Sequence, residues 1–444
     1  MRKSEDYLKL SRSPAVNHLK TELKKSEGAS SFYQTKDFVT THLWTWIYHY
    51  VKSRFGAKHP YPDYKSPQIG IYRLEKIGHF SRTFASKQAT TYPSSDGKHA
   101  DPLAVPGHTD SKTITIGIVS DWATGTPDAR EIGLDLKTKK PDYTIHLGDT
   151  YFVGTSEEIG ANFGHGNWPR GNTASFALLG NHEMFSRGVA FFDKLLPSLG
   201  LRTGDQVYEG QKAGFFCLEN DHWRILGLDT GYHSISKVPG LEMLSWFAGD
   251  GHFDPILMNW LKNTVKLGDP TDKRGLLILT HHQYITGFRD ELEFQMPASQ
   301  LATLIGKDRP VIWLWGHEHK LSVFEKAQVG DGITAYGRCI GHGGMPIELN
   351  GNDFIPSKHR KGFLRLLAFD KRQKDVILGT PVGHNGYVLA KIKNERLVLE
   401  YRDEKKALFK ETWKVDANGK ITGTIQPSQN LELVHGKVWE DAVR

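Results

Sequence analysis

The chain has 444 residues, with 57 Lys or Arg against 50 Asp or Glu and a formal net charge of +7. This length can bury one large core with additions, and two distant cysteines, Cys217 and Cys339, offer neither a disulfide framework nor a thiolate metal site. Residues 1–6 lack the apolar core of a secretion signal and no run of 18 apolar residues exists, so we expect a cytoplasmic protein without a transmembrane segment.

The positive charge is concentrated near the N-terminus. Residues 1–110 contain 17 basic and 10 acidic residues, whereas residues 111–444 contain 40 of each. Such a basic appendage can make weak contacts with a polyanion, although a merely well-solvated region has the same composition. We therefore separate a basic N-terminal extension, residues 1–112. Within it, residues 37–55 are predicted to form a helix that packs on the main domain or lies on a membrane surface, and a Pro- and Gly-rich connector follows.

From residue 113 the pattern changes to strands alternating with helices, which is typical of an α/β layer fold. Helices are predicted at 127–138, 189–196, 255–266 and 298–304, and a Gly- and Asn-rich loop at 161–172. Strands are predicted at 113–119, 143–147, 175–179, 214–218, 223–228, 276–279, 311–315, 332–339, 387–392, 396–401 and 409–415. We assign residues 113–444 to one domain. The strands at 214–218 and 223–228 begin a second sheet, which we expect the β-rich residues 351–444 to complete.

Polar side chains follow several of the predicted strands, at the point where each strand ends. In open α/β sheets the ligand crevice lies beyond the carboxyl ends of the strands. The side chains that fall there are Asp121, Asp149, Asn181, His281, His317 and His319. This set of carboxylate, amide and imidazole suits Zn, Mn or Fe. Six ligands are too many for one tetrahedral ion and suit two adjacent ions, which can hold the attacking and leaving oxygens of a displacement at phosphorus.

The order of these motifs resembles the calcineurin-like metallophosphoesterase family over about residues 113–350. The motifs are Ser120-Asp121-Trp122, Gly148-Asp149, Gly180-Asn181-His182-Glu183, Thr280-His281-His282 and Gly316-His317-Glu318-His319. The first motif, Gly148–Phe152 and Glu183 are most similar to the purple acid phosphatase branch. The resemblance implies a four-layer α/β/β/α sandwich of two mixed sheets that binds two divalent or mixed-valence ions, Fe, Mn or Zn.

The resemblance also implies a distribution of ligands between the two ions. Asp149 would bridge both ions, and Asp121 and His319 would hold the first. The second ion would be held by Asn181, His281 and His317. The family's ligand is the first residue of the double histidine, which leaves His282 outside the ligand set.

Two further residues have implied catalytic roles. His182 would stabilise the charged transition state or protonate the leaving oxygen, and Glu183 would orient its ring.

Two positions depart from the family's pattern. Most members have a histidine two places after the first aspartate, where this chain has Ala123. Purple acid phosphatases use instead a tyrosine three residues after the bridging aspartate, and that position is Phe152. Tyr151 is one residue early. In an extended strand its ring would face the opposite side, whereas a contracted loop could still bring it to the ion, so both alternatives stay open.

Four other polar residues have weaker assignments. His165, Asn167 and His342 either line the substrate entrance or belong to structural turns, with the turns favoured. His146 lies on a predicted strand and is interpreted as a core histidine.

The function expected from the resemblance is that of a metal-dependent phosphoric ester hydrolase, a phosphatase in which a metal-bound hydroxide attacks a phosphorylated small molecule or protein. One alternative is a phosphodiesterase or nuclease, which the basic N-terminal extension favours. An alternative of another class is a non-catalytic scaffold with the same fold, which the loss of a ligand at Ala123 favours.

Overall fold

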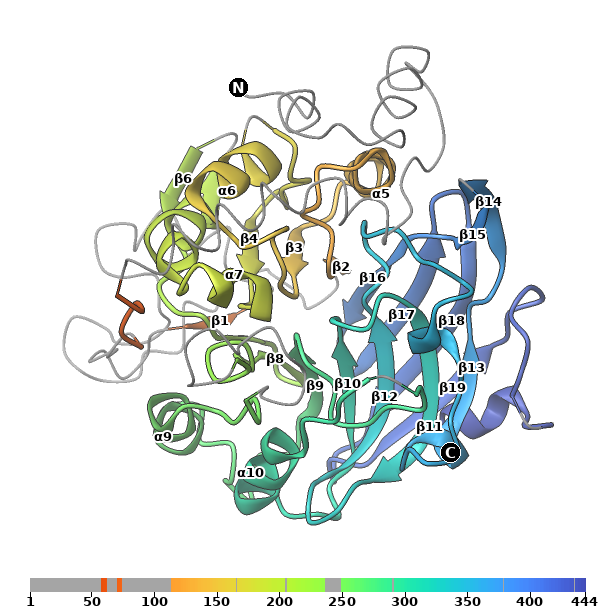
Figure 1. The fold of residues 1–444 in the computed structure, drawn as a ribbon. Coiled ribbons are helices and arrows are strands. Elements are labelled where there is room, and N and C mark those ends of the chain that lie inside the picture. Colours follow the sequence, from red (N-terminus) through yellow and green to blue (C-terminus); the bar gives the residue numbers. More distant parts are fainter. Residues whose placement is uncertain are drawn as a thin grey trace.

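The computed structural model describes residues 57–61, 70–73, 113–164, 166–203, 206–235, 249–289, 291–377, 379–434 and 436–444. Within these residues the chain forms two large mixed sheets covered by helices (Figure 1). The predicted helix over 37–55 and most of the predicted connector lie outside the described residues. No helix in the described part of the chain combines the length and the apolar character that crossing a bilayer requires.

The first sheet has nine strands. In spatial order these are β19 (Ile421–Gln426), β18 (Ala407–Val415), β17 (Arg396–Asp403), β16 (Gly386–Lys393), β2 (Ile114–Val119), β3 (Tyr143–His146), β4 (Ala174–Ala177), β5 (Gly200–Thr203) and β6 (Gln206–Glu209). Strands β2, β3 and β4 are parallel, whereas β16 is antiparallel to β2.

The second sheet has eight strands. In spatial order these are β1 (Ile71–Arg73), β7 (Phe216–Glu219), β8 (Trp223–Gly227), β9 (Gly275–Thr280), β10 (Val311–Trp315), β12 (Thr334–Ile340), β11 (Leu321–Gln328) and β13 (Leu366–Phe369). Strands β8, β9, β10 and β12 are parallel. A separate hairpin consists of β14 (Gln373–Ile377) and β15 (Thr380–Gly383).

The helices are short. The α-helices are α5 (Pro127–Thr138), α6 (Ser156–Phe163), α7 (Asn181–Phe185), α8 (Leu196–Ser198), α9 (Pro255–Asn263) and α10 (Gln295–Ile305). A π-helical turn, η1 (Phe191–Leu195), precedes α8, and three 3-10 turns are η3 (Asn352–Phe354), η4 (Phe363–Arg365) and η5 (Trp439–Ala442).

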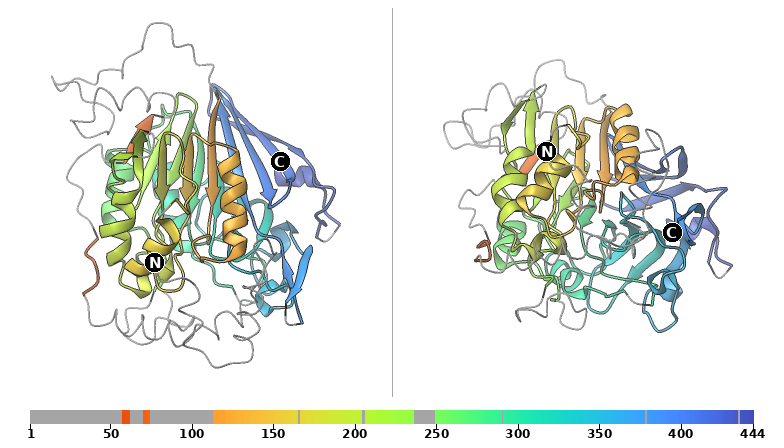
Figure 2. Two further views of the ribbon diagram at one scale, coloured as in Figure 1. Left: turned by 90° about the horizontal axis from the view of Figure 1, so that it is seen from above. Right: turned by 45° about the horizontal axis from the view of Figure 1, so that its top comes forward.

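Helix α5 shows why these residues form these elements. Thr126 accepts a hydrogen bond from the backbone N–H of Ala129, and Pro127 occupies the first helical position, where its missing N–H costs nothing. Ile132 and Leu136 recur four residues apart and bury one face of the helix. The helix lies beside β2 in both views of Figure 2.

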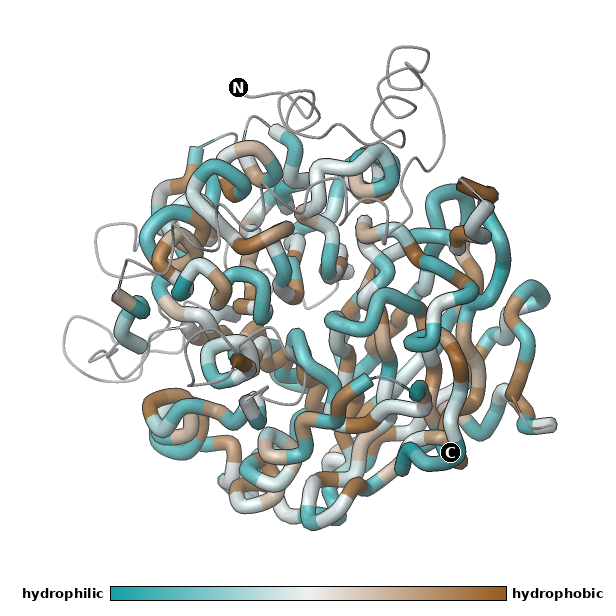
Figure 3. Tube along the Cα trace, in the orientation of Figure 1, coloured by the Kyte–Doolittle hydropathy of each residue, from teal (hydrophilic) through white to brown (hydrophobic). Residues whose placement is uncertain are grey.

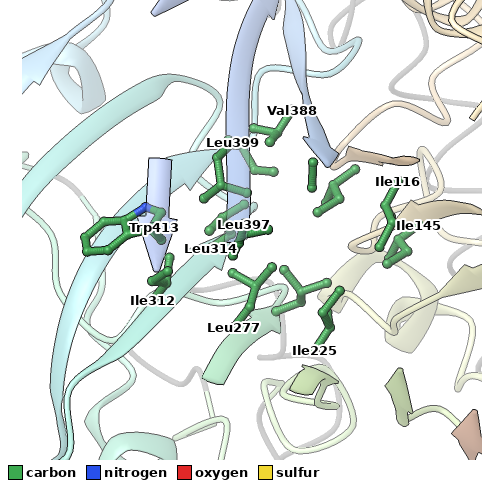
Figure 4. Close-up of a cluster of buried hydrophobic side chains, with 14 of the residues drawn as sticks. Ile116, Ile145, Ile225, Leu277, Ile312, Leu314, Val388, Leu397, Leu399 and Trp413 are labelled. Atoms are coloured by element: carbon green, nitrogen blue, oxygen red, sulfur yellow. The ribbon is translucent and has the colours of Figure 1, made fainter. Parts of the chain in front are cut away.

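Buried residues define four layers. The inner faces of the two sheets pack together through residues such as Ile116, Ile145, Leu277 and Ile312 (Figure 4). Helices α5 and α6 cover the outer face of the nine-stranded sheet, and α9 and α10 cover that of the eight-stranded sheet. The hydropathy of the tube alternates accordingly along the chain, with α9 hydrophobic on one side and hydrophilic on the other (Figure 3). The predicted α/β/β/α sandwich is therefore confirmed.

Most of the C-terminal strands join the nine-stranded sheet, whereas we expected them in the sheet that contains β7 and β8. Strand β16 pairs with β2, so β16–β19 extend the nine-stranded sheet. Of the strands described in the last hundred residues, only β13 lies in the eight-stranded sheet with β7 and β8. The prediction that residues 351–444 complete the second sheet is thus wrong for β16–β19. The free edge of β2 accepts them because parallel strands β3 and β4 lie on its other side.

Two predicted boundaries also differ. The loop predicted over 161–172 begins inside α6, whose capping box joins Thr155 and Glu158. Residues 189–198 are helical, as predicted for 189–196, but residues 191–195 wind as the π-helical turn η1 and α8 extends the helix to Ser198.

Two short parts of the N-terminal extension pack on the domain. Strand β1 pairs with β7, with Ile71 opposite Cys217. The backbone N–H of His59 donates to the Arg187 carbonyl (3.0 Å), and the Tyr232 hydroxyl donates to the His59 carbonyl (2.7 Å). The extension therefore contributes to the edge of one sheet and contacts the loops that follow α7 and β8.

Candidate metal centre

The predicted ligands come from the ends of five strands. Asp121 follows β2, Asp149 follows β3 and Asn181 follows β4, while His281 follows β9 and both His317 and His319 follow β10. Strands β2, β3 and β4 are parallel to one another, as are β9 and β10. In each sheet the predicted ligands therefore lie together, at the carboxyl ends of the strands.

The residues expected to hold the second ion lie together. The Nε2 atom of His281 is 3.2 Å from Oδ2 of Asp149 and 3.2 Å from Oδ1 of Asn181. Its other nitrogen, Nδ1, lies 3.2 Å from the Leu147 carbonyl, which fixes the ring with Nε2 directed at the oxygens. The His317 ring lies 5.3 Å from the His281 ring, measured between centroids. Within the double histidine, His281 is thus the residue whose Nε2 faces the oxygens of Asp149 and Asn181.

The residues expected to hold the first ion also meet. The Nε2 atom of His319 is 3.6 Å from Oδ1 of Asp121. Asp149 is shared by both groups, because its Oδ2 lies 3.2 Å from Nε2 of His281 and 3.3 Å from the Tyr151 hydroxyl. One atom from each of Asp121, Asp149 and His281 lies within 4.8 Å of the other two.

Tyr151 faces the first-ion group. Its hydroxyl is 2.9 Å from Oδ1 of Asp121 and 2.7 Å from Nε2 of His319. The argument from strand alternation does not apply, since β3 ends at His146 and Tyr151 lies in the loop beyond it. Burial, followed by the charges of Asp121 and Asp149, raises the pKa of Tyr151 well above its usual value. The phenol therefore keeps its proton unless a cation replaces it.

The backbone has an uncommon conformation at three of the predicted ligands. Asp121, Asp149 and His317 have φ angles of 56°, 71° and 64°, in the left-handed region that non-glycine residues rarely adopt. Two glycines permit the close packing around them. A Cβ at Gly180 would lie 2.1 Å from Oδ1 of Asp149, and one at Gly316 would lie 1.8 Å from Oγ of Ser120. Such backbone conformations cluster at functional sites.

The ring of His182 lies beside Asp149, with Nε2 3.7 Å from Oδ2. Its Nδ1 atom donates to the Phe152 carbonyl over 2.7 Å. Glu183 was expected to orient this ring, but its Oε2 accepts instead from the backbone N–H groups of Asp149 (3.2 Å) and Gly180 (3.0 Å). The orienting group is thus the Phe152 carbonyl, and Glu183 holds the two motif loops together. Burial and the Asp149 charge raise the pKa of Glu183 to about 7.

The weaker candidates have structural roles where the structure describes them. His146 is buried, accepts the Trp122 N–H at 3.4 Å and has its pKa lowered by burial to about 3, as a core histidine would. The Asn167 amide donates to the Ala161 carbonyl within a turn (2.6 Å). His342 is 2% exposed and so does not line an entrance. His165 lies outside the described residues.

The donor set fits metal ions. Asp121 and Asp149 are two carboxylates, 0% and 1% exposed, in a common cluster, and such buried like charges require cations beside them. The surrounding amide, imidazole and phenol groups are ligands for Fe, Mn or Zn.

The fold and the site together define an α/β protein of two sheets, with metal-binding residues at the carboxyl ends of its strands. The family model for calcineurin-like phosphoesterases matches residues 114–321, and the chain therefore carries a domain of this family. The predicted ligands all fall within that range.

Two solved structures illustrate the wider similarity. GAP50, described as the anchor in the inner membrane complex of Plasmodium, is 11% identical, with 68% of this chain and 89% of that chain covered and a TM-score of 0.42. PhoD is 13% identical, with 73% and 72% covered and a TM-score of 0.40. No curated protein matches the chain.

Proposed function

We propose that the chain is a phosphatase of the purple acid phosphatase type, which hydrolyses phosphoric monoesters at a dinuclear metal centre. The observation that supports it most is the position of Asp149. Its Oδ2 lies 3.2 Å from Nε2 of His281 and 3.3 Å from the Tyr151 hydroxyl, between the two groups of ligands. A carboxylate in this place can bridge two ions. When bound, the ions would lower the pKa of a water molecule so that it can act as the nucleophile. They would also supply positive charge that stabilises the phosphoryl oxygens.

The first-ion position in this proposal is held by Asp121, His319 and Tyr151, with Asp149 shared. Tyr151 replaces the histidine that is absent at Ala123, because its hydroxyl is in contact with Asp121, Asp149 and His319. The second-ion position is held by Asn181, His281 and His317.

His182 handles the proton and charge of the leaving oxygen. Its Nδ1–H is held by the Phe152 carbonyl, so Nε2 is the nitrogen that faces the site. The side chain is 20% exposed, which leaves it accessible to a substrate, whereas the Asp149 side chain is 1% exposed. A protonated Nε2 can give its proton to the leaving oxygen as the ester bond breaks.

The cytoplasm is the location that we propose. The support is that Cys217 and Cys339, both buried, are free thiols, as is usual in a reducing compartment.

The test is a paired assay with p-nitrophenyl phosphate and bis(p-nitrophenyl) phosphate. Protein stripped by a chelator should be inactive, and two equivalents of Fe, Mn or Zn per chain should restore hydrolysis, with the monoester preferred. Preference for the diester would favour the alternative function of a phosphodiesterase. The excess of basic residues in 1–110 is the observation that favours this alternative. Binding of two ions without hydrolysis of either ester would favour the scaffold.

A further inference from the structure

His282 lies among the ligands of the second ion, although the expected ligand set does not include it. One ring nitrogen from each of His281, His282 and His317 lies within 4.8 Å of the other two. The centroid of the His282 ring is 4.7 Å from that of His281 and 4.7 Å from that of His317. Nitrogens bound to one ion at about 2.1 Å are separated by no more than about twice that distance. The three nitrogens lie within 4.8 Å of one another, so small shifts of the rings would bring them to a separation at which they share an ion.

The surroundings of His282 fix the orientation of its ring. Nδ1 lies 3.0 Å from Oγ1 of Thr230, which also accepts the backbone N–H of His282 at 3.0 Å. The hydroxyl oxygen has two lone pairs and can accept both hydrogens. The Phe294 ring packs against the imidazole, with centroids 4.4 Å apart. In the tautomer in which Nδ1 carries the hydrogen and donates it to Thr230, the lone pair of the imidazole is on Nε2.

That second nitrogen is not satisfied by the described protein. Nε2 of His282 is buried and has no hydrogen-bond partner among the described residues, and the residue is 1% exposed. A buried polar atom without a partner is costly and rare, and an ion is one of its standard explanations. Nε2 of His281 illustrates the alternative, since it has oxygen neighbours at 3.2 Å.

We propose that His282 is a further ligand of the second ion, through Nε2, and that Thr230 is the residue that positions it. This inference rests on the proposed function, because it requires an ion at that position. The second ion would then have three imidazoles, from His281, His282 and His317, beside the Asp149 carboxylate and the Asn181 amide. Three imidazoles favour a borderline ion such as Zn²⁺ over the hard Mg²⁺, which prefers oxygen ligands.

The inference is tested by Zn²⁺ titration of the full chain against a competing chelator. In H282F the second Zn²⁺ should bind more weakly by on the order of 100-fold or more, because a ligand and not merely its support is lost. In T230V the loss should be about 10- to 100-fold, as for other residues that hold a ligand in place. The matched control is H222F, which removes an exposed imidazole in the turn between β7 and β8 and should leave both affinities unchanged.

A crystal structure of the Zn²⁺-loaded native protein gives a second reading that does not depend on a variant's folding. A distance of about 2.1 Å between Nε2 of His282 and an ion is expected. Equal affinities for the second Zn²⁺ in H282F and the native protein, or a native distance well beyond bonding range, would overturn the inference alone. Binding of fewer than two ions by the native protein would instead overturn the proposed function.

Discussion

The hydroxyl of Tyr151 lies 2.7 Å from Nε2 of His319, although the two residues are 168 positions apart in the sequence. Together with Asp121 they would surround the first ion of the proposed centre. If Tyr151 binds iron there, its phenolate should give the Fe-loaded protein a visible charge-transfer band. We expect Y151F to lose this band and to bind the first ion more weakly. Absorption spectra and iron content of the two proteins provide the measurement.

The matched control for this prediction is Y284F. Tyr284 is also buried, but its hydroxyl donates to the Ala335 carbonyl (3.3 Å) within the eight-stranded sheet. The band should persist in Y284F. A band that survives in Y151F would show that Tyr151 is not an iron ligand.

Removal of His182 should separate catalysis from metal binding. We expect H182A to hydrolyse p-nitrophenyl phosphate about 10²- to 10⁴-fold more slowly, which is the usual contribution of a positioned acid or base. Its metal content should equal that of the native protein, because the ring contacts the Phe152 carbonyl and Asp149 and is not one of the proposed ligands. The neighbouring variant N181A should lose the second ion. Full activity in H182A would contradict the assigned role.

A buried ion pair between the two sheets should contribute strongly to the free energy of unfolding. Arg338 in β12 donates through Nε to Glu411 in β18 (2.7 Å), and both side chains are 0% exposed. R338M leaves the Glu411 carboxylate buried without its partner, so the free energy of unfolding should fall by about 3–5 kcal/mol. Urea titration measures this change.

Two controls accompany the Arg338 variant. The double variant R338M/E411L removes both charges and should regain much of the lost stability. K307A removes an exposed lysine paired with Asp331 and should leave unfolding unchanged. A loss in R338M no larger than that in K307A would contradict the prediction.

His342 should make folding sensitive to acid. Burial lowers its pKa to about 4 against the opposing charges of Asp370 and Glu404, from an ordinary value of 6.5. Between these values the unfolded chain binds a proton that the native protein does not, so stability falls as pH drops from about 6.5 to about 4. In H342Q this loss should be smaller by roughly 3 kcal/mol, the equivalent of the full shift.

Chemical unfolding at several pH values checks this difference. The control H222Q removes an exposed histidine and should keep the native pH dependence. Parallel pH profiles for H342Q and the native protein would argue against the prediction.

The strand ends could be predicted because each metal motif follows a local apolar run. The place of Tyr151 could not, since the alternation rule holds only inside a strand and Thr150 pairs with Ala123 merely as an isolated bridge. The role of Glu183 was wrong for a similar reason. Its neighbour in the sequence is His182, but its carboxylate caps the loop at Gly180 and Asp149, which folding brings together.

The sheet that receives β16–β19 was also beyond sequence reasoning. Alternation along each strand shows that one face is buried, and this information is local. Which sheet edge a strand joins depends on the edges that remain free, and here β2 offers one to β16. His282 shows the same limit at the site. The sequence of the double histidine does not indicate which ring nitrogen lacks a partner. Thr230, which contacts Nδ1 of His282, follows a different strand, β8.

The pairing of β1 with β7 bears on how the protein is made. Ile71 leaves the ribosome long before its partner Cys217 has been synthesised, so this edge of the sheet must close late. Until then the backbone groups along β1 lack this partner and can pair with any other extended segment. A shortened chain beginning at residue 113 would lack β1 and leave the edge along β7 open, and we expect it to aggregate during expression even though every proposed metal ligand is present.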